Sequence, residues 1–200
     1  MKIIPVLAVG AAFGAVTSLV NALSSPFSSL GAPLVGTVPG GAAKVLSLLL
    51  DAGWTWAALA VAVGVTARTW GRGAAAGALG LMAATAAYYV TDSFARGEPL
   101  AGYGPDLILW WVASVLFGSV LGVVGAAVRR PGVIGLLAAL TVPVGAAAQM
   151  LLMPPRPHMT LTPGIIAAEA LVWTAAAAGA VWAVHRFRSE RRAPRHPVGH

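Results

Sequence analysis

The chain contains no cysteine, few charged residues and very few acids. Its 200 residues include 13 Lys and Arg, 6 Asp and Glu, and no Cys. Without cysteine, disulfide bonds, thiolate nucleophiles and Cys-ligated metal sites are all excluded. Charged residues make up 10% of the chain, whereas soluble domains have about 25%. So few charges could not cover the surface of a soluble fold, and an ordinary soluble domain is therefore excluded.

The chain instead contains long apolar runs. Hydrophobic residues make up 58% of the chain, and six runs have about the 20 residues that a helix needs to cross a bilayer. Helices are expected because backbone groups in lipid must be bonded internally and because period-2 alternation is absent. The second run is the weakest, since Asp51 interrupts it. The predicted spans are 3–23, 45–67, 73–91, 106–128, 132–153 and 164–182.

These runs predict an all-α membrane protein, a six-transmembrane-helix bundle with both termini in the cytoplasm. We expect residues 1–186 to form one transmembrane domain and residues 187–200 to form a basic, disordered cytoplasmic tail. The chain has more basic than acidic residues, and the basic residues flank the predicted spans. Anionic lipid headgroups account for their positive charge, so no nucleic-acid partner is expected.

The basic residues set the predicted orientation in the cell membrane. Lys and Arg are concentrated in cytoplasmic loops of membrane proteins, so loops 24–44, 92–105 and 154–163 are predicted to face outside. Only Lys44, Arg96 and Arg156 fall on that side. The other side holds Lys2, Arg68, Arg72, Arg129, Arg130, Arg186, Arg188, Arg191, Arg192 and Arg195.

The N-terminal run has a second interpretation. Lys2, the apolar residues after it and Val20-Asn21-Ala22 resemble a signal peptide with its cleavage site. The run is longer than the roughly 7–15 residues usual for such a segment, and we therefore favour an uncleaved span. Cleavage would leave five spans with the same loops outside.

Small residues recur at four-residue spacing in three of the predicted spans. Such faces let helix backbones approach closely in lipid, where the hydrophobic effect does not drive helices together. We favour packing within the bundle. The alternative is a face that docks another membrane protein or a second copy of the chain. The spaced glycines are Gly10 and Gly14, Gly73 and Gly77, and Gly118 and Gly122.

Two acids lie inside predicted spans, where charge is costly and a functional role is the first hypothesis. Asp51 and Glu169 are each about five or six residues, or roughly 9 Å, from the outer ends of their spans. Trp54 and Trp173 follow these acids by three and four residues and share their helical faces. Further polar side chains are expected at the same outer level: Asn21, Tyr88, Tyr89 and Gln149.

Two interpretations of this polar level remain open. In the first, the side chains converge on an outward-facing pocket that binds or transports a small polar or cationic solute, or a proton. In the second, Asp51 pairs with Lys44, Glu169 pairs with Arg156 or a helix end, and the aromatic residues belong to an interfacial belt. The alternative function is a non-enzymatic accessory protein that docks another membrane protein through its small-residue faces.

No catalytic residue, metal site or cofactor is expected. The chain has no HExxH or GxSxG motif and no paired metal-ligand spacing. His158 lies in a Pro-rich loop, and the other three histidines lie at or beyond the end of the last span. With no catalytic motif and no histidine inside a span, we expect that the protein is not an enzyme; an intramembrane enzyme with Asp51 or Glu169 as general base is the least favoured hypothesis.

The layout resembles that of a known protein family. Phe13-Gly14-Ala15-Val16-Thr17 lies in the first span, Asp51 and Trp54 open the second, and Ala86-Ala87-Tyr88-Tyr89 closes the third. This pattern is similar to a family of small integral membrane proteins from actinobacteria, known mainly as a domain of unknown function. The resemblance implies a six-helix membrane fold.

A looser likeness is to the substrate-binding subunits of energy-coupling-factor vitamin transporters. Those subunits are six-helix proteins with an outward substrate pocket and an Ala-xxx-Ala face on the first helix for the energising partner. Ala8 and Ala12, or Ala11 and Ala15, match that spacing. The likeness implies a solute-binding subunit that works with a membrane protein partner.

Overall fold

A computed structural model describes residues 2–154 and 162–192. These residues contain helices and no strand, which confirms the all-α fold class. The helices are α1 (Ile3–Ser24), α2 (Val38–Leu50), α3 (Gly53–Val65), α4 (Trp70–Arg96), α5 (Gly104–Val128), α6 (Val133–Leu152) and α7 (Pro163–Arg192), with short 3₁₀ turns η1 (Ala32–Leu34) and η2 (Leu100–Tyr103).

Five helical segments in the described residues are long and apolar enough to cross a membrane. They are α1, α4, α5 together with η2, α6 and α7. The bent pair α2 and α3 makes a sixth if the two helices form one span, with an angle of 62° between them. The helices are therefore compatible with a polytopic membrane protein.

The distribution of side chains is compatible with a lipid environment. The core holds many small residues, and Ala60, Ala76 and Ala84 are fully buried. Large apolar side chains lie outside instead; Ile108 and Phe117 on α5, for example, are 65% and 66% exposed. A contiguous apolar surface of this kind is rare on soluble monomers. A lipid environment accounts for it, because lipid tails are as apolar as these side chains.

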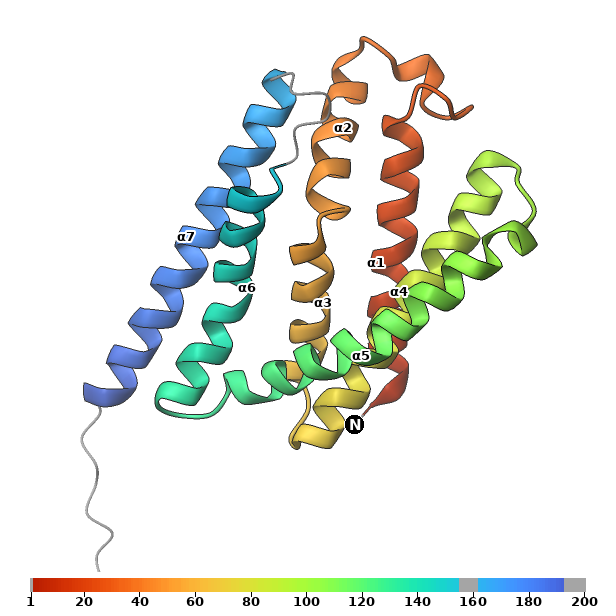
Figure 1. Cartoon of the computed structure of the whole chain (residues 1–200). Helices are drawn as coiled ribbons and strands as arrows, with labels where there is room; N and C mark the ends of the chain where they lie inside the picture. The colour runs from red at the N-terminus through yellow and green to blue at the C-terminus, as the bar shows by residue number, and fades with distance from the viewer. Residues whose placement is uncertain (1, 155–161, 193–200) are drawn as a thin grey trace, which may run out of the picture.

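The helices form two groups on either side of α2 and α3 (Figure 1). In the first group, α1 packs along α4, and α4 crosses α5. In the second group, α6 and α7 pack against each other. The central pair joins the groups, because α3 contacts α4, α5 and α6 while α2 contacts α1 and α7. Residues on α1 and α4 are thereby separated from residues on α6 and α7.

Glycines allow α1 and α4 to approach with their backbones almost in contact. A Cβ atom placed on Gly10 would overlap the carbonyl oxygen of Gly80, and one on Gly14 would overlap the carbonyl oxygen of Ala84. The four-residue spacing of Gly10 and Gly14 thus places both glycines at the same crossing. Val6 and Phe13 pack beside it, against the core that contains Ala84.

A second crossing brings α3, α4 and α5 together. A Cβ atom on Gly77 would overlap the carbonyl oxygen of Gly118, and one on Gly122 would overlap that of Gly73. Gly64 of α3 meets the same Gly122 backbone from the other side. All four spaced glycines of α4 and α5 therefore face each other inside the bundle.

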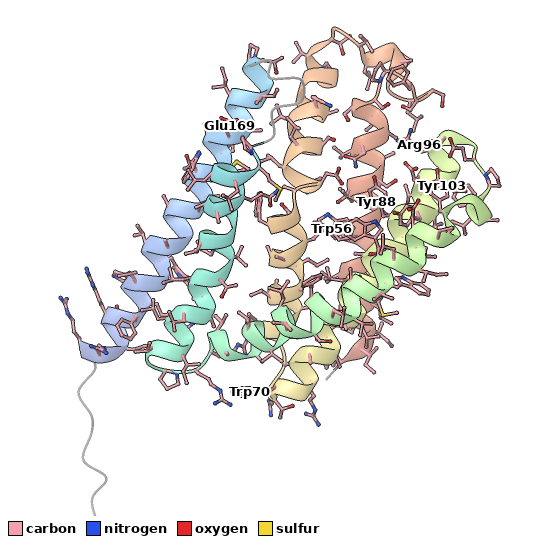
Figure 2. The ribbon with its side chains drawn as sticks, viewed as in Figure 1. Trp56, Trp70, Tyr88, Arg96, Tyr103 and Glu169 are labelled. Atoms are coloured by element: carbon pink, nitrogen blue, oxygen red, sulfur yellow. The ribbon has the colours of Figure 1, made fainter. Side chains whose placement is uncertain are left out.

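Alternate connections lie at opposite ends of the bundle (Figure 1). The chain start, the α3–α4 and α5–α6 turns and the end of α7 lie at one end, here called the basic end. Residues 25–37 and the α4–α5 turn lie at the other, the distal end. The Arg130 guanidinium stacks over the Trp70 ring at 4.7 Å, and Figure 2 shows Trp70 at this basic end. The described Lys and Arg side chains of the basic end are Lys2, Arg68, Arg72, Arg129, Arg130, Arg186, Arg188, Arg191 and Arg192.

The last helix extends further than its apolar run. α7 continues to Arg192, ten residues beyond the predicted end of the span at 182, so residues 187–192 of the predicted tail are helical. An ion pair between Arg186 and Glu190, 2.9 Å apart, spans one turn of this extension. Arg156, His158 and residues 193–200 lie outside the described residues.

Gly122→Ala tests how far stability depends on the three-helix crossing. The new methyl group would meet the Gly73 and Gly77 backbones, and such overpacking costs about 1–3 kcal/mol. The matched variant is Gly71→Ala, because a Cβ atom there meets nothing within 4 Å. Thermal unfolding in detergent should show a lower midpoint for Gly122→Ala alone. Equal midpoints would contradict the role of the crossing.

Candidate functional site

A short break interrupts the helical conformation between α2 and α3. α2 ends at Leu50, Asp51 follows in a helical conformation, and Ala52 is extended with ψ 138° before α3 begins at Gly53. Asp and Gly are weak helix formers, so the sequence Asp51-Ala52-Gly53 favours an interruption here. The Asp51 side chain is exposed at the break.

Two side chains bond backbone groups that the break would otherwise leave open. The Thr55 hydroxyl donates to the Leu49 carbonyl at 2.6 Å. The Trp54 backbone N–H donates to the side-chain oxygen of Gln149 at 3.0 Å. Gln149 belongs to α6, so it caps the amino end of α3 from a neighbouring helix. One of the open N–H groups at the positive end of α3 is thus bonded on the side of α6.

A polar cluster joins α1, α2 and α4 beside the break. The Asn21 amide donates to the Tyr88 hydroxyl at 3.0 Å, and the Ser47 hydroxyl donates to the Asn21 oxygen at 2.7 Å. Ser47 lies one turn before Asp51 on α2 and shares its face. Asp51 is close enough to Tyr88 to interact with it electrostatically. We call Asn21, Ser47, Asp51 and Tyr88 the break cluster.

Aromatic rings continue from the break cluster through the first helix group. The Trp56 ring lies between Phe13 and Tyr88, with centroid distances of 5.2 and 6.3 Å. Tyr89 lies between Tyr88 and Tyr103, with centroid distances of 5.4 and 5.3 Å. Most of these contacts are edge-to-face, the arrangement that ring quadrupoles favour. Figure 2 shows Trp56, Tyr88 and Tyr103 following one another across α3, α4 and the α4–α5 turn.

A buried acid near the distal end of α4 is fully paired. Asp92 is 5% exposed; the Arg96 side chain donates to both its oxygens at 2.9 and 3.0 Å. The Tyr103 hydroxyl lies 2.9 Å from Asp92 and 2.9 Å from Glu98, and its single hydrogen serves one carboxylate at a time. A buried charge requires such partners. This network fixes the α4–α5 turn and leaves little free capacity for a ligand.

The eight side chains predicted at the outer level fall on two sides of α2 and α3. Asn21, Tyr88 and Tyr89 lie with Asp51 in the first helix group. Trp54 packs with Leu49 against Met150 of α6 and Val172 of α7. In Figure 2, Glu169 lies across the central pair from Tyr88. The second side therefore holds Trp54, Gln149, Glu169 and Trp173.

Of the two structural pairs predicted for the acids, the structure tests only the one between Asp51 and Lys44. Asp51 and Lys44 are both described, and they form no ion pair. The predicted partner of Glu169, Arg156, lies outside the described residues. Glu169 is half-buried on α7.

Five residues that build this region are not among the predicted site residues. Ser47 could have been found from its spacing to Asp51, and Asp92 and Arg96 from their i,i+4 relation. Trp56 and Tyr103 gave no such signal, because their contacts join separate helices. The described residues contain no group of three or more acids or histidines that could hold a metal ion.

Comparisons of the chain with models of protein families, with curated proteins and with solved structures find no match.

A double-mutant cycle tests the break cluster. Asn21→Leu and Tyr88→Phe each remove one side of the 3.0 Å hydrogen bond. We expect each to lower the free energy of unfolding by about 1 kcal/mol, with a coupling of about 0.5–1 kcal/mol between them. Tyr89→Phe, combined with Asn21→Leu, is the matched control and should show no coupling. Additive effects of Asn21 and Tyr88 would contradict the cluster.

Proposed function

We propose that this chain is a cell-membrane protein that binds a small cationic solute at the break between α2 and α3, with Asp51 as the anionic ligand. One observation carries the proposal: a carboxylate is exposed at a helix break within an apolar segment. Helices interrupted in this way supply binding sites in membrane transporters, because their ends present backbone groups to a ligand.

The depth of Asp51 supports this role. Ser47 bonds to Asn21, which lies three residues before the end of α1 at Ser24. Asp51 follows Ser47 by one turn toward the basic end, which places it roughly 10 Å below the end of α1 at 1.5 Å per residue. A charge inside the hydrocarbon region costs about 2.5–3.5 kcal/mol on insertion scales. Water or a ligand at the break would remove this cost.

The local charges favour a cation over an anion. The carboxyl end of α2 points at the break and carries a partial negative charge, which adds to the charge of Asp51. The positive end of α3 is met by the Gln149 oxygen instead. Tyr88, which interacts electrostatically with Asp51, contacts the Trp56 ring, and faces of such rings attract cations.

The alternative of docking through the spaced glycines is not favoured. Gly10 and Gly14 are covered by α4, and the glycines of α4 and α5 cover each other. Ala8 and Ala12 are exposed on α1, so the face implied by the likeness to transporter subunits is available to a partner. That likeness agrees with a solute-binding role and stays a prediction.

The proposal includes an orientation. We infer that α2 and α3 form one broken span and that the basic end lies in the cytoplasm, as the excess of Lys and Arg at that end supports. The break cluster then lies in the outer half of the membrane, and a solute reaches it from outside.

Labelling of single cysteines tests this orientation on a chain that has none of its own. Ser29→Cys lies at the distal end and Ser189→Cys at the basic end, and both side chains are exposed. A membrane-impermeant maleimide applied to intact cells should label Ser29→Cys and should label Ser189→Cys only after lysis. The opposite pattern would overturn the orientation.

Ligand-induced stabilisation tests the binding role of Asp51. Purified protein is titrated with ammonium, guanidinium and tetramethylammonium while thermal unfolding is followed. We expect at least one cation to raise the midpoint by about 5–10 °C at a hundredfold excess over its Kd, because binding to the folded state alone stabilises it. Asp51→Asn should abolish this shift.

The matched control is Asp106→Asn, which neutralises another exposed acid of the distal end. It should keep the full shift. A shift that survives Asp51→Asn, or that disappears equally in Asp106→Asn, would contradict the proposed site. The absence of stabilisation by any of the three cations would contradict the proposed ligand class.

A further inference from the structure

A hollow of about 400 Å³ opens at the distal end, away from the break cluster. The end of α1, residues 25–37 and the first turns of α2 surround it, and Figure 1 shows this segment arching over the two helices. Its size falls in the range of small-molecule sites, roughly 300–1,000 Å³. Leu23, Leu34 and Val35 give it apolar walls.

Local hydrogen bonds hold the walls in place. The Ser28 hydroxyl donates to the Ala22 carbonyl and accepts the Gly31 N–H at 2.9 Å, which ties the segment to the end of α1. The Thr37 hydroxyl donates to the Leu34 carbonyl at 2.7 Å and accepts the Gly40 N–H at 3.2 Å, which ties it to the start of α2. The hollow is therefore preformed by the chain itself.

The hollow carries a single positive charge. Lys44 is the one charged residue among those that line it, and it makes no ion pair with any described residue. The hydroxyls of Ser24 and Thr37, which also line the hollow, already donate to backbone carbonyls. The first turn of α2 also lines the hollow through Gly40 and Gly41, and its partial positive charge adds to that of the ammonium group.

We propose that this hollow binds a small amphiphilic monoanion, a carboxylate with an apolar body. The carboxylate pairs with the Lys44 ammonium group, and the body packs against Leu23, Leu34 and Val35. One unpaired cation selects a single negative charge, and the apolar walls select a hydrocarbon group over water. The site is separate from the proposed cation site, because Lys44 and Asp51 are seven residues, or roughly 10 Å, apart along α2.

Binding of radiolabelled octanoate tests the proposal. The protein is held in nanodiscs of zwitterionic lipid, and the signal of empty nanodiscs is subtracted. We expect saturable binding that Lys44→Gln weakens at least tenfold, because it removes a charge-assisted contact. Lys2→Gln, the matched loss of a lysine at the basic end, should leave the affinity unchanged. Octanol and acetate, which each lack one half of the ligand, should compete weakly.

A second variant tests the hollow without changing any charge. A Cβ atom on Gly41 meets nothing within 4 Å, so Gly41→Leu should fold and fill part of the space. It should abolish octanoate binding, while Gly71→Leu, equally open and far from the hollow, should preserve it. The proposal is overturned if Gly41→Leu binds like wild type, if Lys44→Gln and Lys2→Gln behave alike, or if no saturable binding is found.

Discussion

The close approach of helix backbones at glycine is the constraint on which the rest of the structure depends. Lipid supplies no hydrophobic drive between helices, so association relies on contact area and backbone proximity. Gly73, Gly77, Gly118 and Gly122 let α4 and α5 cross with their main chains in contact. α1 then packs on α4, and α3 packs on both helices, which places Asn21 beside Tyr88 and Trp56 beside Phe13. The position of the break cluster is thus a result of glycine packing some distance below it.

The sequence predicted the helices well and their ends less well, for a physical reason. Apolar runs report where lipid contacts the chain, whereas a helix continues as long as its backbone bonds are satisfied. α4 was expected to end at 91, but it runs to Arg96 because Asp92 and Arg96 pair across one turn. The start of α2 at Val38 lies before the predicted span start at 45; Thr37 as a cap and Pro39 in the first turn were signals of it.

The sequence predicted how deep the residues of the candidate site lie within their spans, but not which of these residues meet. Counting residues from the outer ends of the spans placed Asn21, Tyr88 and Gln149 at about the same depth. Which of them meet depends on helix neighbours, and a single sequence does not specify these. The structure joins Asn21 to Tyr88 and Gln149 to the start of α3, on opposite sides of the central pair. One expected pocket therefore became two separate polar regions.

The shortness of α2 has a consequence for how the two proposed ligands would influence each other. This helix has 13 residues, or roughly 20 Å of length, with Lys44 at its middle and Asp51 at its carboxyl end. An anion at Lys44 and a cation at Asp51, roughly 10 Å apart, would be thermodynamically linked, since each would change the field in which the other binds. Such linkage is reciprocal. α2 would then act as a coupling element between the membrane surface and the interior of the bundle.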